Sequence, residues 1–320
     1  MRVFVSHPSD KLDGYFGAEA AAALAAFAEV RTNPEPRELA TAALAAARLR
    51  GADRLPADAG AGSAVRGAAC ARCLRALCRR HLHRRRRCGV LVTQASAGFV
   101  AAVSEWVIAV MIDLARGISR SAEAYHRGDA AWPTMGRELR GATLGIVGFG
   151  RIGRAVAELA AAFGMRVVVS DPHVGAAAGT ASMLPLAALL AASDFVVCLA
   201  TAGADTEKLI DGAAFAAMKR GAIFVNASRG ELVDEAALLA ALDSGRLAGC
   251  AVDVGLAADQ MPSPAVARHP LVIATPHIGG LTRTATSHQA CETVAQIKAP
   301  LQGRLPPGAV NANEATRLRR

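Results

Sequence analysis

The stretch from residue 143 to residue 171 reads TLGIVGFGRIGRAVAELAAAFGMRVVVSD. An apolar run from Thr143 to Val147 leads into a glycine pattern between Gly148 and Gly153, and a second run, Val167 to Ser170, precedes Asp171. The residues between the glycines and the second run suit a helix. Strand, glycine-rich turn, helix and strand in this order predict a βαβ unit of a parallel sheet.

Each glycine of the pattern has its own physical task. We expect Gly148 to permit the tight turn out of the strand, Gly150 to let the backbone approach a pyrophosphate, and Gly153 to let the helix pack closely on the sheet. The helix start at Arg151-Ile152 directs unpaired N–H groups at the phosphates. Asp171 is placed to accept hydrogen bonds from ribose hydroxyls and to repel a 2′-phosphate. The unit therefore predicts that the cofactor is NAD rather than NADP.

The composition is that of a globular protein with two domains. The 320 residues are 52% hydrophobic and 4% aromatic, which predicts cores built largely from Ala, Val, Leu and Ile. No signal peptide is evident, and no apolar stretch reaches the roughly 18 residues that a membrane-spanning helix needs. The seven cysteines, an odd number, favour reduced thiols. We expect a soluble cytoplasmic protein with no membrane partner.

Strand and helix signals alternate along most of the chain. After a first region with a strand at 3–5, a helix at 15–28, a strand near Val30 and a helix at 38–50, a strand is expected at 89–93 and a helix at 100–118. Beyond these, strands are expected at 143–147, 166–170, 195–200, 222–227, 250–254 and 271–274, and helices at 153–163, 185–191, 212–219, 235–244 and 284–301. The predicted fold is α/β, with two Rossmann-like doubly wound domains. The NAD-binding domain, 99–283, is inserted in a smaller substrate (catalytic) domain formed by 1–98 and 284–320.

Polar residues follow three of the expected strands. Arg229 comes after the strand at 222–227, Asp253 closes the next strand, and His277 follows the last. Ligands of open α/β sheets bind beyond the carboxyl ends of the strands, so these side chains are expected beside the nicotinamide. An imidazole near its pKa exchanges a proton with the oxygen of a ketone or alcohol, and a guanidinium binds a carboxylate in bidentate fashion. The set suits hydride transfer between a 2-hydroxy acid and a 2-keto acid.

These motifs together resemble the D-isomer-specific 2-hydroxyacid dehydrogenases, over residues 89–310 closely and 1–53 loosely. The resemblance implies that Arg229 binds the substrate, His277 is the catalytic acid/base, and Asp253 bonds the nicotinamide carboxamide. It also implies a homodimer in which the helix from Val100 forms part of the interface. Besides the glycine pattern and Asp171, the matching stretches are Asn226-Ala-Ser-Arg-Gly-Glu-Leu-Val-Asp-Glu235, Ala251-Val-Asp-Val254 and Thr275-Pro-His-Ile-Gly-Gly280.

The chain departs from this family at its third catalytic residue, a glutamate in a stretch that resembles D-V-F-x-x-E-P. Here the sequence is Asp253-Val-Gly-Leu-Ala-Ala-Asp-Gln-Met-Pro262, with Ala258 at the spacing of the glutamate. If the loop carries one extra residue, Asp259 takes the catalytic position and pairs with His277. The alternative is a solvated loop acid.

The segment from Arg54 to Cys88 fits neither domain. Residues 66–88 hold nine arginines and no acid, and the remaining 27 basic residues equal the 27 acidic ones, so the net charge of +9 arises here alone. The family's glycine-containing substrate loop is missing from this region. Three interpretations are open: a stretch read in a shifted frame of a GC-rich gene, an arginine arm that binds phosphates, and a zinc knuckle formed by Cys70, Cys73, Cys78 and His83. The surrounding arginines oppose a cation, so no metal is predicted.

The leading hypothesis is therefore an NAD-dependent oxidoreductase that interconverts a small D-2-hydroxy acid and its 2-keto acid. A non-catalytic NAD-binding member of the family, a pseudoenzyme or a corepressor-like protein, is the alternative because the substrate loop is disrupted. An arginine-mediated nucleic-acid binder is the weakest alternative, since no aromatic residues interleave with the arginines to stack on bases.

Overall fold

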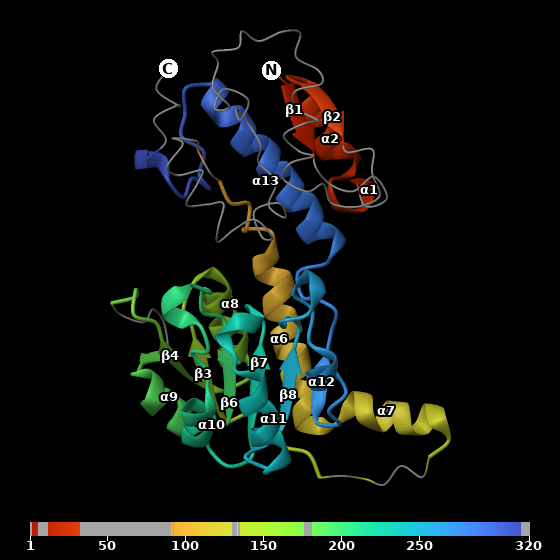
Figure 1. Ribbon diagram of the computed structural model, residues 1–320, viewed down its shortest axis with the longest axis vertical. Coiled ribbons are helices and arrows are strands. Elements are labelled where there is room, and N and C mark those ends of the chain that lie inside the picture. Colours follow the sequence, from red (N-terminus) through yellow and green to blue (C-terminus); the bar gives the residue numbers. More distant parts are fainter. Residues whose placement is uncertain are drawn as a thin grey trace. The chain divides into compact units, whose positions relative to one another are not determined.

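The computed structural model describes residues 2–5, 12–32, 91, 93–129, 133, 135–175 and 181–314. The expected helix at 38–50, the segment 54–88 with its cysteines, and most of the expected strand at 89–93 lie outside the described residues. Two compact units make up the chain (Figure 1): one comprises residues 1–99 and 283–320, and the other comprises residues 100–282.

The first unit contains a small parallel sheet packed on a long helix. Strand β1 (Arg2–Val5) pairs with β2 (Glu29–Thr32), and α1 (Leu12–Tyr15) and α2 (Gly17–Ala25) connect them. The prediction of a single helix at 15–28 is therefore wrong. Gly17, with φ of +74°, separates α1 from α2, and α2 ends at Ala25. Buried apolar residues of β1 and α2 pack with residues of α13 (Arg283–Leu301) in one core: Val3, Val5, Leu24, Ala290, Val294 and Ile297.

The second unit is built on a seven-stranded parallel sheet. Its order is β5-β4-β3-β6-β7-β8-β9, and the direction of strand succession reverses between β3 and β6. The strands are β3 (Thr143–Val147), β4 (Arg166–Ser170), β5 (Ser182–Met183), β6 (Phe195–Cys198), β7 (Ala222–Asn226), β8 (Leu247–Val252) and β9 (Val272–Ala274). The expected doubly wound sheet is confirmed. Two details differ: β5 was not anticipated because only two residues pair, and β8 begins at Leu247 and ends one residue before Asp253.

Helices cover both faces of this sheet, which explains why its strands are apolar on both sides. In β6, Phe195 and Val197 face a core shared with α6 (Phe99–Arg116) and α8 (Arg151–Ala162), while Val196 and Cys198 face the other core. The second core includes α9 (Leu186–Ala192), α10 (Gly212–Ala217) and α11 (Glu235–Asp243). Burial raises the pKa of the Cys198 thiol to about 12, so this cysteine stays protonated and behaves as a small apolar residue.

The helix expected at 100–118 is two helices. Gly117 has φ of +67° and ends α6, and α7 (Ile118–Arg127) begins in a new direction. None of the residues of α7 is buried. Even its large apolar side chains lie at the surface, because Ile118 is 54% exposed and Tyr125 is 71% exposed. Figure 1 shows α7 extending away from the sheet. None of the helices in the described ranges is long and apolar enough to cross a membrane.

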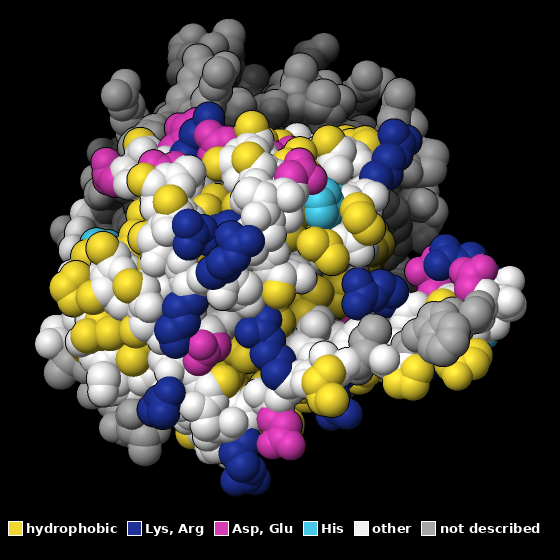
Figure 2. All heavy atoms as spheres, turned by 90° about the horizontal axis from the view of Figure 1, so that it is seen from below, with side chains coloured by type: hydrophobic (Ala, Val, Ile, Leu, Met, Phe, Trp, Pro, Cys, Tyr) yellow, Lys and Arg dark blue, Asp and Glu magenta, His cyan; other side chains and the backbone are white. Residues whose placement is uncertain are grey.

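Basic residues gather where the strands begin. Arg140 precedes β3, Arg166 opens β4, and Arg246 precedes β8. Figure 2 shows Lys and Arg side chains over the face seen from below, with few acidic side chains between them. The helices that connect the strands have their C-terminal ends on this side of the sheet. Positive charges near the C-terminus of a helix are favourable. Arg246 donates from Nη1 to the carbonyl of Met218 at the end of α10, in keeping with a structural role.

The Asp194 carboxylate connects two of the segments at this end of the sheet. Its Oδ2 accepts from the backbone N–H of Thr143 at 2.8 Å, and its Oδ1 contacts Nζ of Lys219 at 2.9 Å. Burial by itself raises the pKa of Asp194, but the hydrogen bonds from Lys219 and Thr143 outweigh burial and hold the pKa below its usual value. The carboxylate therefore joins the start of β3 to the loop before β7.

Candidate functional site

The turn from β3 into α8 requires glycine at two positions for the protein's own packing. Gly148 has φ of +99°, and a Cβ there would lie 2.5 Å from the backbone nitrogen of Ala200. A Cβ at Gly153 would lie 2.4 Å from the carbonyl oxygen of Gly148. Gly150 differs, because a Cβ built there meets no atom within 4 Å. No protein atom therefore occupies the space that a side chain at residue 150 would fill, and a pyrophosphate can approach the backbone there.

The start of α8 has the properties of a phosphate site. Its N-cap is Gly150, which contributes no side chain to satisfy the first N–H groups of Arg151, Ile152 and Gly153. Ile152 packs against the core, whereas Arg151 is exposed. These N–H groups and the helix dipole favour an anion at this point, so the local structure fits the diphosphate of a dinucleotide.

Asp171, directly after β4, also supports the glycine turn. Its Oδ2 accepts from the backbone N–H of Phe149 at 2.7 Å, and its Oδ1 accepts from that of His173 at 2.9 Å. A carboxylate oxygen can accept two hydrogen bonds, and each oxygen of Asp171 accepts one of these backbone bonds. Both oxygens can therefore also accept a hydrogen bond from a ribose hydroxyl. The guanidinium of Arg154 lies 4.6 Å from the centroid of the Phe149 ring and holds the other side of the turn. Asp171 thus orients the turn in addition to its expected ribose contact.

The turn after β7 presents Arg229. Asn226 is 1% exposed and spans this turn, because its Oδ1 accepts from the N–H of Ser228 and its Nδ2 donates to the carbonyl of Arg229. The hydroxyl of Ser228 donates to the carbonyl of Ala200, beyond β6. Arg229 itself is half-buried, with Nη1 donating to the carbonyl of Ser228. The turn is therefore fixed to its own strand and to its neighbour.

Asp253 organises the loop that carries His277. The carboxylate is 5% exposed, and its Oδ1 accepts from the hydroxyl of Thr275 at 2.6 Å and the N–H of Ile278 at 2.8 Å. Its Oδ2 accepts from the N–H of Gly279 at 2.7 Å. His277, between these donors, is half-buried and has φ of +57°. Residues other than glycine seldom adopt this conformation, and it occurs here because donors on both sides of His277 are bound to one carboxylate.

Glycines bring the turns after β7 and β8 into backbone contact. A Cβ at Gly230 would lie 2.3 Å from the carbonyl carbon of Gly255, and a Cβ at Gly255 would lie 2.5 Å from Cα of Pro262. Gly255 stands where the family pattern has phenylalanine, and this absence of a side chain lets the segment ending at Pro262 fold back over the strand end. The backbone N–H of Asp253 completes the junction by donating to the carbonyl of Asn226.

The loop between Gly255 and Pro262 closes on itself through two backbone hydrogen bonds. The N–H of Gly255 donates to the carbonyl of Gln260 at 2.8 Å, and that of Ala257 donates to the carbonyl of Met261 at 3.0 Å. Asp259 lies in the 3-10 turn Ala258–Gln260, but its side chain is outside the described part of the structure. Its pairing with His277 therefore stays a prediction.

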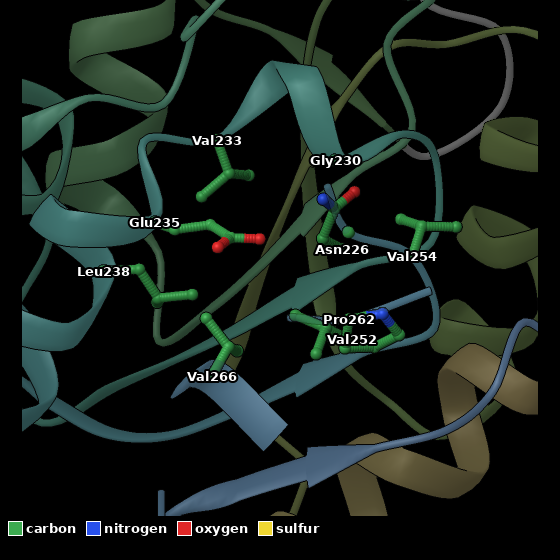
Figure 3. A pocket seen from close by; sticks show the side chains of 10 residues that line it. Asn226, Gly230, Val233, Glu235, Leu238, Val252, Val254, Pro262 and Val266 are labelled. Atoms are coloured by element: carbon green, nitrogen blue, oxygen red, sulfur yellow. The ribbon is translucent and has the colours of Figure 1, made fainter. Parts of the chain in front are cut away.

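A small pocket lies behind the Arg229 turn (Figure 3). It encloses about 250 Å³ of space, part of it open to solvent. The Glu235 side chain, from the first residue of α11, reaches toward Asn226 and Gly230, and its Oε1 accepts from the N–H of Leu256 at 3.4 Å. Apolar residues form most of the remaining wall: Val233, Leu238, Val252, Val254, Pro262 and Val266. Val266 belongs to α12 (Pro264–Ala267), a short helix that the sequence pattern did not indicate.

The structure thus brings Arg229, Asp253 and His277 to the ends of the adjacent strands β7, β8 and β9. The glycine turn and Asp171 lie at the same edge, at the ends of β3 and β4. Sequence reasoning missed the contacts of Gly255 and the position of Gln260, although a glycine in place of the family's aromatic residue is a signal that a backbone passes close by. Among the described residues, no group of three or more His, Cys, Asp or Glu side chains is arranged to hold a metal ion.

Comparisons with known proteins agree with this geometry. Residues 108–279 match the model of the "D-isomer specific 2-hydroxyacid dehydrogenase, NAD binding domain". D-3-phosphoglycerate dehydrogenase of Rattus norvegicus is 37% identical over 234 residues, which are 71% of this chain and 43% of that protein. The chain therefore spans less than half the length of the curated relatives it matches.

Two solved structures extend the comparison to the fold. The TT0316 protein from Thermus thermophilus is 30% identical, with a TM-score of 0.76, over 97% of this chain and 100% of that one. A glyoxylate reductase from Paecilomyes thermophila is 28% identical, with a TM-score of 0.67, over 72% and 71%. The family model covers more than half of the chain and includes the glycine turn, Asp171, Arg229, Asp253 and His277. The chain therefore belongs to the D-isomer specific 2-hydroxyacid dehydrogenase family and carries its NAD-binding domain.

Proposed function

We propose that the protein is an NAD-dependent oxidoreductase that interconverts a small D-2-hydroxy acid and its 2-keto acid. The observation that carries the proposal is the Asp253 carboxylate, which lies at the end of β8, the strand next to the Arg229 turn. It fixes the backbone on both sides of His277, which follows β9. Reduced NAD, when bound, supplies the hydride. The rate enhancement then depends on how this chain places a proton donor and a cation around the reacting carbonyl.

His277 and Arg229 divide that work. As hydride reaches the keto carbon, negative charge develops on the oxygen, and a protonated His277 donates a proton to it. In the reverse direction, neutral His277 accepts the proton of the hydroxyl. Arg229 binds the substrate carboxylate, and its charge favours the polarised carbonyl. We propose that Asp259 stabilises the imidazolium. Backbone contact between Gly230 and Gly255 keeps the two turns at a fixed separation.

The proposal is tested by oxidation of NADH with a panel of 2-keto acids that includes glyoxylate, hydroxypyruvate and phosphohydroxypyruvate. We expect turnover with at least one of them and D-stereochemistry in the products of hydroxypyruvate and phosphohydroxypyruvate, which are chiral, whereas the product of glyoxylate is not. Little use of NADPH is expected, because Asp171 repels a 2′-phosphate. Tight NADH binding without turnover on the whole panel would instead identify a non-catalytic member of the family.

We also propose a homodimer, with α7 as the contact. Ten-residue helices are marginal on their own in water, and α7 has no buried residue in the described chain. The family resemblance implies that the helix from Val100 forms part of the interface. Five residues of that helix are buried in the core of the second unit, namely Val107, Ile108, Val110, Met111 and Ala115, so the proposal places the contact on α7, which follows it in the chain. Sedimentation velocity is expected to give a dimer that Ile118→Glu converts to monomers, and a monomeric wild-type protein would reject the proposal.

A reducing cytoplasmic location, suited to the buried thiols of Cys198 and Cys250, is proposed as well.

A further inference from the structure

Arg154 lies where a helix does not favour a positive charge. It is the fourth residue of α8, and the first turn of this helix holds no acidic residue. The helix dipole makes cations unfavourable near an N-terminus. The Arg154 side chain is half-buried, and its guanidinium lies over the Phe149 ring, with 4.6 Å between Cζ and the ring centroid. The partner that the structure gives to this cation is therefore an aromatic ring of the glycine turn.

Phe149 connects Arg154 to Asp171. Its ring is 2% exposed and belongs to the core that α8 covers, while its backbone N–H donates to Oδ2 of Asp171 at 2.7 Å. Gly148 and Gly150 flank this residue, and glycine restricts the backbone less than any other residue does. The side chain of Phe149 therefore limits the motion of a backbone that its neighbours leave free, and Arg154 covers that side chain.

We propose that Arg154 is a positioning residue that sets the preference for NADH over NADPH. By holding the Phe149 ring, it keeps the Phe149 N–H on Asp171 and so keeps the carboxylate turned toward the ribose hydroxyls, where it repels a 2′-phosphate. The other bond of Asp171, from the N–H of His173, lies within its own segment, so the bond from Phe149 ties the carboxylate to the glycine turn. The inference rests on the proposed function only for the binding of a nicotinamide dinucleotide at this turn.

The first test measures dissociation constants for NADH and NADPH by fluorescence titration, without reading turnover. Wild type is expected to bind NADH about 100-fold more tightly than NADPH, and Arg154→Met to reduce this ratio to about tenfold. Methionine covers the ring with an uncharged side chain of similar length. Loss of a positive charge by itself disfavours the more anionic NADPH, so a ratio that moves toward NADPH distinguishes repositioning of Asp171 from loss of charge. Arg154→Lys keeps a cation over the ring and is expected to stay within about threefold of the wild-type ratio.

The second test reads the bond between Phe149 and Asp171 in the nucleotide-free protein. Amide hydrogen exchange, followed by NMR, is expected to be at least about tenfold faster at the Phe149 N–H in Arg154→Met than in wild type. The N–H of Gly148 donates to the carbonyl of Ser170 and serves as the internal control. Its exchange is expected to be unchanged, which separates a local release of Phe149 from a general loosening of the unit.

A double-mutant cycle shows whether Arg154 acts through Asp171. Asp171→Asn removes the charge that repels a 2′-phosphate and is expected to abolish the preference for NADH. Added to that variant, Arg154→Met is expected to change the ratio by less than about twofold. Arg140→Met, at an exposed position before β3, is the matched control and is expected to bind both nucleotides as wild type does.

Four results would overturn the inference. The first is an unchanged ratio in Arg154→Met, and the second is an equal loss of affinity for both nucleotides, which would assign Arg154 to folding alone. The third is unchanged exchange at the Phe149 N–H, and the fourth is additivity in the cycle, since Arg154 would then act independently of Asp171. A protein that binds NADH but turns over no keto acid leaves these measurements intact, so failure of the proposed function is a separate result.

Discussion

Replacing His277 with asparagine is expected to lower kcat for reduction of the best 2-keto acid by ~10²–10⁴-fold, the usual contribution of a general acid. The reason is chemical: the oxygen of the reacting carbonyl loses its proton donor, and an amide does not supply one at neutral pH. Asparagine is the sharper replacement because it tolerates the positive φ of residue 277 better than alanine does. The loop bound to Asp253 therefore keeps its shape.

The measurement is steady-state kinetics beside NADH titration. The dissociation constant for NADH is expected to change by less than about threefold in His277→Asn, since the residues proposed to bind the nucleotide are those of the glycine turn and Asp171. His277→Ala is expected to lose kcat to the same extent and, because alanine is strained at this φ, to melt at a lower temperature. His288→Ala, at an exposed position of α13, serves as the control. Unchanged kcat in His277→Asn would remove this residue from the mechanism.

The parts of the site that local patterns encode were predictable. The glycine turn and Asp171 form one βαβ unit whose spacing is fixed by helix length and strand register, so a single stretch of sequence contains the information. Arg229 and His277 follow apolar strands, and parallel strands carry their ends to one edge of a sheet. Once the strands were located, their convergence followed from the topology, which the observed strand order confirms.

The parts that depend on contacts between distant backbones were not predictable. Gly117 divides two helices whose apolar pattern reads as one, because α6 packs on the sheet and α7 does not. Gly255 accommodates Pro262 and Gly230, and no periodicity in the sequence states which backbone will approach a glycine. Asp171 illustrates the same limit, since its bond to Phe149 appears only when the turn is folded. Sequence reasoning assigned residues to strand ends, but packing decides which of them support one another.

Gly150→Ala is expected to weaken NADH binding by about 100-fold, or about 2.7 kcal/mol, without lowering the melting temperature of the nucleotide-free protein. A Cβ at Gly150 meets no protein atom within 4 Å, and the residue has φ of −72°, so alanine fits the folded chain. The added methyl group instead occupies the space into which the N–H groups of α8 point. Its cost therefore arises only when the diphosphate approaches the turn.

Gly148→Ala provides the contrast that makes this result informative. A Cβ at Gly148 would lie 2.5 Å from the Ala200 nitrogen, and φ there is +99°, so this substitution is expected to lower the melting temperature before any nucleotide is added. Gly212→Ala, in ordinary contact with Ala237, is expected to change neither quantity. Calorimetry of the three variants, with and without NADH, separates a glycine needed for folding from one needed for the ligand. If Gly150→Ala bound NADH as tightly as wild type, the diphosphate would not pass over residue 150, and the position of the cofactor on this edge of the sheet would need to be redrawn.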